Sequence, residues 1–440
     1  MDTTFRSMYQ GLYIYLSARK ERRDLLLSQR PPRFDESLDS MISRSEDDFT
    51  RIALKAKAAQ DYFLLIGPPG TGKTSCALKK MVETFHADKD AQILLLSYTN
   101  RAVDEICKSL ASIAPAVDFI RVGSELSCDE AYRGHLIENE LSSCNRRSEV
   151  YERIRNCRII VGTVAAISGK PELFCLKHFD VAIIDEATQI LEPQLLGILC
   201  ARGEDGKDAI DKFVLIGDHK QLPAVVQQNT EQSAIYDESL LSIGLTNLKD
   251  SLFERLYRNC TATVHRSYDM LCRQGRMHPE VALFANRAFY GGRLIPVGLP
   301  HQIESSDTIC RLAFYPSVPE KAGASAKINY SEARIVADLA ARIYEDHQTD
   351  FDESRTLGII TPYRSQIALI KKEIESLGIP ALNRILVDTV ERFQGSERDV
   401  IIYSFCVNYP YQLKFLSNLT EEEGVLIDRK LNVALTRARK

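Results

Sequence analysis

The sequence predicts an α/β protein of two domains, each built on a mostly parallel sheet. The chain has 440 residues, of which 45% are hydrophobic, so it can bury more than one core. Short apolar runs alternate with helical stretches and stop at Ser, Gly or Asp, as buried parallel strands do. After Leu256 a second series of such runs begins, which indicates the second domain.

The expected strands of the first domain are Tyr62–Ile66, Ile93–Ser97, Arg158–Gly162, Val181–Asp185 and Phe213–Gly217. Those of the second domain are Thr356–Thr361, Ile385–Val390 and Val400–Phe405. Because a parallel sheet binds its ligand at the carboxyl ends of its strands, we expect functional residues directly after these runs.

Three parts are expected along the chain. They are a helical accessory lead over 1–48, a first domain over 49–258 and a second domain over 259–440. The lead carries a basic run at Arg19–Arg23, which is more typical of a solvated helix face than of a nucleic-acid contact.

Two kinds of segment interrupt the alternation of strands and helices. Residues 107–157 are rich in Glu, Ser and Arg and show no strand rhythm, so we expect a helical insertion there. Residues 344–354 and 409–423 are acidic and polar, which indicates surface excursions.

The segment Gly67–Thr74, with the sequence GPPGTGKT, has the residues and the context of a phosphate-binding loop. An apolar strand precedes it and a helical pattern follows it, so glycine backbone N–H groups and a helix N-terminus can surround an anion. Lys73 would contact the β- and γ-phosphates, and the Thr74 hydroxyl would hold Mg²⁺. The alternative is a glycine-rich turn without a ligand. The expected ATP contacts are Gly67, Pro68, Pro69, Gly70, Thr71, Gly72, Lys73 and Thr74.

Two further strands end in polar residues that suit the same chemistry. Asp185 and Glu186 close one strand, where one carboxylate can hold Mg²⁺ and the other can take a proton from the attacking water. The alternative is that one of them caps the next helix. Gln221, after the following strand, can contact the γ-phosphate.

The second domain has no second phosphate loop and is expected to contribute arginines instead. Arg276 and Arg437 are candidates to reach across an interdomain cleft and stabilise charge on the transferred phosphoryl group. The alternative for each is a surface salt bridge.

Composition narrows the class of protein. No stretch approaches the roughly 20 apolar residues of a membrane span, and no secretory signal opens the chain, so we expect a cytoplasmic protein, with a nucleoid or nuclear place left open. Eleven scattered cysteines without a C-x-x-C pair favour reduced, buried thiols over a metal site. The net charge of −4 means that any polyanion must meet a local basic patch.

The order of the motifs resembles that of superfamily 1 helicases, in the branch of the nonsense-mediated-decay helicase and the Dna-two type replication nuclease-helicase. The resemblance runs from about Asp61 to Lys440. Besides the residues above, it rests on Ser97–Asp104, Val161–Thr163, Asp185–Gln189, Gly217–Leu222, Ser251–Leu256, Arg276–Pro279, Gly358–Gln366, Phe393–Glu397 and Leu431–Arg439.

The resemblance implies two RecA-like P-loop NTPase domains with ATP and Mg²⁺ in the interdomain cleft. It implies single-stranded nucleic acid as the partner, with DNA favoured over RNA and movement from 5′ to 3′; it implies neither a membrane nor an oligomer. By the same resemblance Glu397 matches a nucleotide-sugar contact. The matching strand contacts are Thr99, Thr163, Tyr363 and Thr389.

Several features depart from the family pattern. The position of the family's adenine-reading Gln falls near Phe49, and Gln274-Gly275-Arg276 lacks an aromatic residue that the family has. The family's barrel, nuclease and last strand have no counterpart, so we expect a fragment or a pared-down relative that an extension past Lys440 would stabilise. Three functions stay open: a translocase that unwinds duplexes, an ATPase that displaces bound proteins without unwinding, and an inert binding fragment.

Overall fold

The computed structural model describes residues 3–229, 231–263, 265–304, 311–320, 325–422 and 424–440. The chain divides into two compact units. The first comprises Met1–Pro68, Gly72–His219 and Pro223–Leu271, and the second comprises Pro69–Thr71, Lys220–Leu222 and Cys272–Lys440. Each unit is built of helices around a mostly parallel sheet, which confirms the predicted fold class of two RecA-like units.

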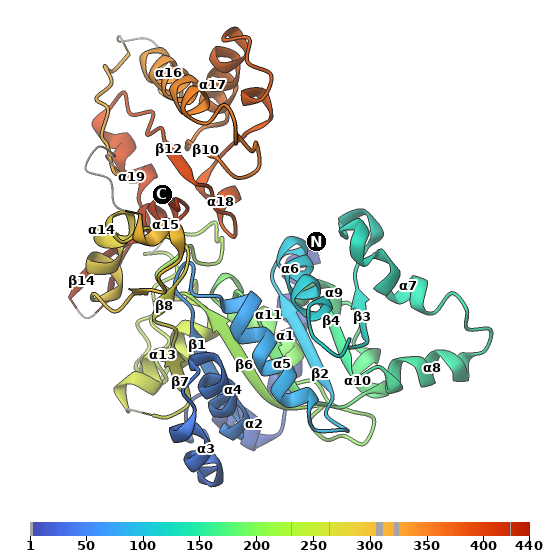
Figure 1. Ribbon diagram of the computed structural model, residues 1–440. Coiled ribbons are helices and arrows are strands. Elements are labelled where there is room, and N and C mark those ends of the chain that lie inside the picture. The colour runs from blue at the N-terminus through green and yellow to red at the C-terminus, as the bar shows by residue number, and fades with distance from the viewer. Residues whose placement is uncertain (1–2, 230, 264, 305–310, 321–324, 423) are drawn as a thin grey trace. The chain divides into compact units, whose positions relative to one another are not determined.

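The first unit contains a seven-stranded sheet in which every neighbouring pair is parallel (Figure 1). The strand order is β3-β4-β2-β5-β6-β1-β7. The strands are β1 (Tyr62–Ile66), β2 (Ile93–Ser97), β3 (Phe119–Val122), β4 (Ile159–Thr163), β5 (Phe179–Ile184), β6 (Ile210–Gly217) and β7 (Tyr268–Met270).

Strand β1 shows why its sequence is a continuous apolar run. Tyr62, Leu64 and Ile66 point into one hydrophobic cluster, whereas Phe63 and Leu65 point into another on the opposite face of the sheet. Because helices cover both faces, neither set of alternating side chains meets water. The strand is therefore buried along its whole length.

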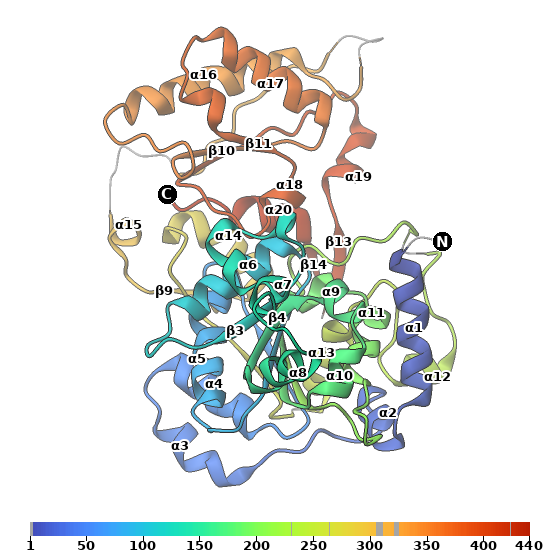
Figure 2. The ribbon, with the colours of Figure 1, turned by 90° about the vertical axis from the view of Figure 1, so that its right-hand side faces the viewer.

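Helices α4, α5 and α6 cover one face of this sheet, and α9, α11 and α13 lie on the other, where α1 packs against the outer side of α11 (Figure 2). The helices of the unit are α1 (Thr3–Ser17), α2 (Lys20–Leu26), α3 (Asp39–Arg44), α4 (Asp48–Ala58), α5 (Lys79–His86), α6 (Asn100–Ala111), α7 (Ile137–Glu140), α8 (Arg147–Asn156), α9 (Val164–Ser168), α10 (Glu172–Leu176), α11 (Glu192–Leu199), α12 (Glu238–Ser242) and α13 (Leu252–Ala262). Short helical turns are η1 (Glu36–Leu38), η2 (Lys73–Leu78), η3 (Glu125–Ser127), η4 (Glu130–His135) and η5 (Ala187–Gln189).

The helical lead belongs to the first unit. Helix α1 packs on α11 so closely that a Cβ at Gly11 would lie 2.2 Å from the backbone oxygen of Pro193. Only glycine allows this approach. Further along, Arg30 and Arg33 both donate to the buried carboxylate of Asp61, at distances of 2.7 to 3.1 Å. These contacts hold the lead against the start of β1.

The second unit contains a three-stranded parallel sheet in the order β11-β10-β12, an antiparallel β13-β14 pair and a short parallel β8-β9 pair. The strands are β8 (Arg273–Gln274), β9 (Ile295–Pro296), β10 (Leu357–Ile360), β11 (Leu386–Asp388), β12 (Val400–Tyr403), β13 (Leu419–Glu422) and β14 (Val425–Asp428). The helices are α14 (Pro279–Tyr290), α15 (Pro300–Ile303), α16 (Tyr330–Asp346), α17 (Arg364–Ser376), α18 (Val390–Phe393), α19 (Leu413–Leu416) and α20 (Arg429–Leu435), with turns η6 (Leu382–Arg384) and η7 (Pro410–Gln412).

The structure differs from the prediction over residues 107–157. Besides α7 and α8, this range contains β3, which pairs with β4 at the edge of the sheet, so the segment is not wholly helical. The strand has only four residues, and Arg121 interrupts its apolar pattern. Such a short strand carries too little periodicity to be recognised from sequence.

The separation of the units also differs from the predicted boundary between residues 258 and 259. That position lies inside α13, and the following β7 pairs with β1 in the sheet of the first unit. The units separate instead between Leu271 and Cys272. Strand β7 has only three residues and one of them is the charged Asp269, so the sequence contains no apolar run that would predict this strand.

Two findings bear on the predicted protein class. Within the described ranges, no helix combines the length and the apolar character that crossing a bilayer requires. The ten cysteines in those ranges are all free, and six of them are buried, whereas Cys310 lies outside the described residues.

Candidate functional site

The predicted phosphate-binding loop follows β1 directly and leads into the helical turn η2. Gly72 has φ of 76°, in the left-handed region that favours glycine. A Cβ at Gly67 would lie 2.0 Å from the Cγ of Lys73, so this glycine leaves the space through which the lysine side chain passes. Both glycines are therefore required by the path of the loop.

The first unit brings together four predicted residues at the carboxyl ends of β1 and β5. Lys73 Nζ lies 2.9 Å from Glu186 Oε1. The Thr74 hydroxyl donates a hydrogen bond to Asp185, and the Glu186 N–H donates to the same carboxylate at 2.9 Å. One lysine, one hydroxyl and two carboxylates thus form a single cluster.

The cluster changes the ionisation of its members. Burial raises the pKa of Asp185 to about 6, and the negative charge of Glu186 acts in the same direction. Burial opposes the charge on Lys73, but the carboxylates of Glu186, Asp185 and Asp218 outweigh it and raise the pKa of the lysine. Lys73 therefore stays cationic.

The backbone of Glu186 is held in an unusual conformation. Its φ of 54° lies in the left-handed region, which non-glycine residues adopt rarely. The Glu186 carboxylate also accepts a hydrogen bond from Gln189 Nε2 at 2.9 Å. Gln189 is part of the Asp185–Gln189 motif, but the sequence assigned it no role. In the structure its amide orients the Glu186 carboxylate.

The oxygen donors in this cluster fit a magnesium ion. Mg²⁺ prefers carboxylate and other oxygen ligands and keeps several of its waters. The Thr74 hydroxyl and the Asp185 carboxylate are already in contact, so one hard cation can bind to both. These two residues would hold the ion.

In the second unit, Arg437 and Gln221 lie together. Arg437 is 2% exposed, and its guanidinium donates to Gln221 Oε1 at 3.3 Å, to the Val433 carbonyl at 3.0 Å and to the Ser396 carbonyl at 3.3 Å. The alternative of a surface salt bridge is therefore wrong for this arginine. A buried guanidinium needs such a set of acceptors, because an unpaired one would be costly.

Arg276 makes an ion pair with another predicted residue of the second unit. Its Nε lies 2.6 Å from Glu397 Oε2, and its Nη1 donates to the Thr436 carbonyl at 3.3 Å. Burial opposes ionisation of Glu397, but the nearby Arg276, Arg439 and Arg437 outweigh it and lower the pKa of the carboxyl. Gln274, which the sequence did not single out, accepts the backbone N–H of Arg276 at 3.0 Å.

The predicted strand contacts lie close after the carboxyl ends of four parallel strands. Thr99 follows β2 and Thr163 ends β4, and each hydroxyl caps the next helix by accepting a backbone N–H, at 3.2 and 3.1 Å. Tyr363 and Thr389 follow β10 and β11 in the second unit. Within each unit these residues therefore lie on the ligand-binding edge of the sheet.

The departure at Phe49 also lies at the phosphate-binding loop. Its ring is 3.5 Å from the place that a Cβ on Gly72 would occupy. An apolar ring therefore stands at this position, where the family pattern has an amide. Phe49 therefore places an aromatic ring beside the loop, and this ring has no hydrogen-bonding group.

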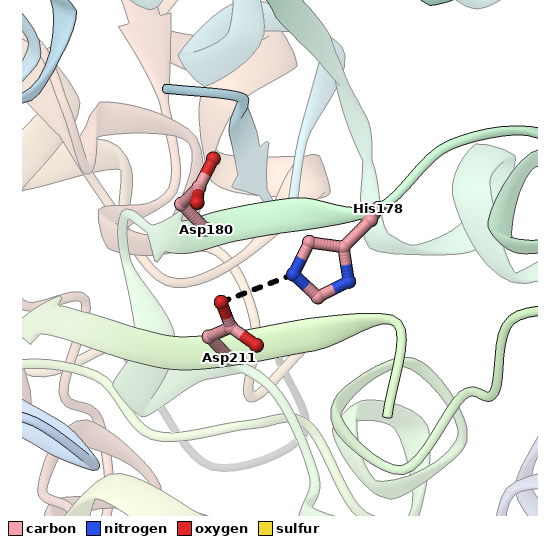
Figure 3. Close-up of side chains that lie close together, drawn as sticks. All are labelled: His178, Asp180 and Asp211. Atoms are coloured by element: carbon pink, nitrogen blue, oxygen red, sulfur yellow. Dashed lines mark ion pairs between the residues drawn. The ribbon is translucent and has the colours of Figure 1, made fainter. Parts of the chain in front are cut away.

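A separate group of three side chains that could bind a metal lies at the amino ends of β5 and β6 (Figure 3). The group consists of His178, Asp180 and Asp211. His178 Nε2 pairs with Asp211 at 3.0 Å, and Asp180 accepts the backbone N–H of Gln92 at 2.6 Å. Each of the three side chains thus already has a partner within the protein, so we assign them no ligand.

Comparison with known proteins agrees with this geometry. Two family models, both described as AAA domain, match this chain, one over residues 44–150 and 137–229 and the other over 248–440. Similar proteins include the DNA replication ATP-dependent helicase/nuclease DNA2 of Xenopus laevis, 29% identical over 96% of this chain and 40% of the relative. They also include the helicase/nuclease JHS1 of Arabidopsis thaliana, 29% identical over 95% of this chain and 30% of the relative.

A third relative is named as a helicase alone. The DNA polymerase alpha-associated DNA helicase A of Saccharomyces cerevisiae is 24% identical over 92% of this chain and 65% of its own length. The chain thus spans about two fifths of the length of the DNA2 proteins that it matches.

Proposed function

We propose that this chain, which belongs to the superfamily 1 helicases in the branch of the DNA2-type replication enzymes, hydrolyses ATP to move along single-stranded nucleic acid and separate duplexes. The single observation that carries the proposal is the cluster of Lys73, Thr74, Asp185 and Glu186 beside the glycine loop. The names of the relatives support DNA over RNA and a role in replication, and the family resemblance supports movement from 5′ to 3′.

ATP binding requires Lys73 to change partners. Its ammonium, now paired with Glu186, turns to the β- and γ-phosphates, while the backbone N–H groups of Gly67–Thr74 surround the same anion. Thr74 and Asp185 would hold Mg²⁺, which would supply positive charge to neutralise the phosphates. Breaking the Lys73–Glu186 pair removes the ammonium that opposes protonation of the Glu186 carboxylate.

Hydrolysis then needs a base and a stabiliser of negative charge. Glu186, oriented by Gln189, accepts a proton from the water that attacks the γ-phosphorus, and the bond to the β-phosphate oxygen breaks. We assign Arg276 and Arg437 the role of stabilising the negative charge that develops on the transferred phosphoryl group. Gln221 contacts the γ-phosphate, and Glu397 contacts the sugar of the nucleotide.

The nucleic acid binds through groups that do not read sequence. Thr99, Thr163 and Thr389 offer hydroxyls to backbone phosphates, and Tyr363 offers a hydroxyl and a ring. Contacts of this kind suit an enzyme that advances along a strand of any sequence. We further propose that the protein acts where DNA is replicated, in the nucleoid or the nucleus.

Two assays test the proposal together. The ATPase rate is measured without nucleic acid and with single-stranded DNA or RNA of matched sequence, with Lys73→Ala as the inactive control. Strand separation is measured on blunt, 5′-tailed and 3′-tailed duplexes. We expect stimulation by DNA above RNA and separation of the 5′-tailed duplex. Stimulated turnover without strand separation would contradict unwinding and favour an ATPase that displaces bound proteins. An absence of ATP turnover would refute the proposal.

A further inference from the structure

The second unit contains a pocket of about 430 Å³, within the range of roughly 300–1,000 Å³ typical of ligand sites. It lies at the carboxyl ends of the strands, because Thr361 follows β10, Glu391 follows β11 and Tyr403 ends β12. The surrounding elements are labelled β10, β12, α18 and α19 in Figure 1. The lining residues are Ala326, Lys327, Ile360, Thr361, Pro362, Tyr363, Val390, Glu391, Tyr403, Tyr411, Gln412, Phe415, Leu416 and Lys430.

Four aromatic residues line this pocket, and two of them are exposed. Tyr411 and Phe415 are 54% and 59% exposed, with ring centroids 6.3 Å apart and planes at 89°. Tyr409 stacks on Tyr411 at 5.7 Å with an interplanar angle of 14° and so supports its orientation. Because the two exposed rings are perpendicular, a flat ligand can stack on one of them while its edge meets the other.

The segment that carries these rings is held in place by Gln412. This residue is 2% exposed, its Oε1 accepts the backbone N–H groups of Asn408 and Tyr409 at 2.9 Å each, and its Nε2 donates to the Ala326 carbonyl at 2.6 Å. The same Nε2 lies 3.3 Å from the Tyr363 hydroxyl. The rings are thus presented on a fixed backbone, which lowers the entropy lost on binding a ligand.

The polar groups of the pocket favour an anionic ligand. Lys430 pairs with Glu391 at 3.5 Å, whereas the exposed Lys327 makes no ion pair with any residue that the structure describes. Thr361 is fully buried, and in that same part of the chain its hydroxyl has no hydrogen-bond partner. A bound ligand can pair with this lysine through a negative charge.

We propose that this pocket holds one nucleobase of the bound single strand, stacked on the Tyr411 and Phe415 pair, with a neighbouring phosphate on Lys327. The inference rests on the proposed function and assigns the strand a base contact from a segment, 409–423, that the sequence predicted to be a surface excursion. Base stacking on aromatic rings tolerates any sequence, as a moving enzyme requires. The Lys327 ammonium supplies the charge that the phosphate needs.

The test compares two ligands of equal length and charge. Tyr411→Ala and Phe415→Ala are titrated with fluorescent oligothymidylate and with an oligomer in which abasic sites replace the bases. We expect affinity for oligothymidylate to fall by about 5- to 100-fold, the effect of losing one base stack, while affinity for the abasic oligomer stays within about twofold. Tyr411→Phe should retain binding because it keeps the ring. Tyr330→Ala, which removes an exposed tyrosine that does not line the pocket, is the matched control.

The outcomes separate this inference from the function on which it rests. If the parent chain binds oligothymidylate but both alanine variants bind it equally well, the pocket is not a base site. An equal loss on both oligomers would also overturn the inference, since it would reflect charge or folding rather than stacking. If the parent chain binds neither oligomer, the proposed function fails as well. Lys327→Gln should weaken binding of both oligomers and flatten its dependence on salt.

Discussion

Replacing Glu186 by Gln should separate nucleotide binding from turnover. The change keeps the size of the side chain and leaves an amide oxygen to accept the Gln189 hydrogen bond, but it removes the base. Losing a general base costs about 10²–10⁴-fold in rate. Lys73→Ala is the comparator, because it removes the cation that contacts the phosphates while leaving Glu186 in place.

The structure also sets the expected change in affinity. Lys73 Nζ and Glu186 Oε1 are 2.9 Å apart, with side chains 14% and 19% exposed. ATP must compete with this pair. Much of the attraction between such charges is offset by their desolvation, so we take its net value as about 1 kcal/mol. Glu186→Gln should then bind ATP as well as the parent or up to about fivefold more tightly, whereas Lys73→Ala should lose about tenfold or more.

Two measurements decide the outcome. Binding of a fluorescent, non-hydrolysable ATP analogue gives the affinity, and phosphate release with saturating oligothymidylate gives the turnover. The reasoning would be refuted if both variants lost ATP affinity equally, because Glu186 would then serve binding. It would also be refuted if Glu186→Gln kept parental turnover, because another group would then be the base.

Three further outcomes are expected. Arg276→Ala and Arg437→Gln should each bind the ATP analogue normally but lose about 10³-fold in stimulated turnover, and parental turnover in either variant would remove that arginine from the site. Affinity for single strands should fall with salt with a log–log slope of about −2 to −4, for roughly three to five phosphate contacts; a flat response would argue against nucleic acid. Asp61→Asn should destabilise the first unit by about 2 kcal/mol in thermal and urea unfolding at pH 7. Burial opposes ionisation of Asp61, but hydrogen bonds from Arg30 and Arg33 hold its pKa below the usual value, so this stabilisation is present above about pH 4 and is lost as the pH falls further. The parent and the variant should therefore converge in acid, and a constant difference would contradict the assignment.

Features that depend on neighbouring residues could be predicted from the sequence. An apolar run, a glycine loop and a helical pattern predicted β1, the phosphate-binding loop and the following helix, because each is specified within about fifteen residues. Asp185 and Glu186 were found in the same way, from their position after an apolar run. Even the opposed faces of β1 are implied by its unbroken apolar sequence, since such a strand needs cover on both sides.

Contacts between distant residues depend on the folded chain and could not be predicted in this way. Lys73 and Glu186 are 113 positions apart, and Arg437 and Gln221 are 216 apart, so no local pattern shows that they touch. The burial of Arg437 corrected the surface alternative for the same reason. Segment 409–423 was predicted from its polar composition to be a surface excursion, and the exposed Tyr411 and Phe415 agree with this. The composition did not show that these two rings line a pocket at the carboxyl ends of the strands. Composition records which groups a segment contains, whereas their placement depends on strand pairings that close over long stretches of chain.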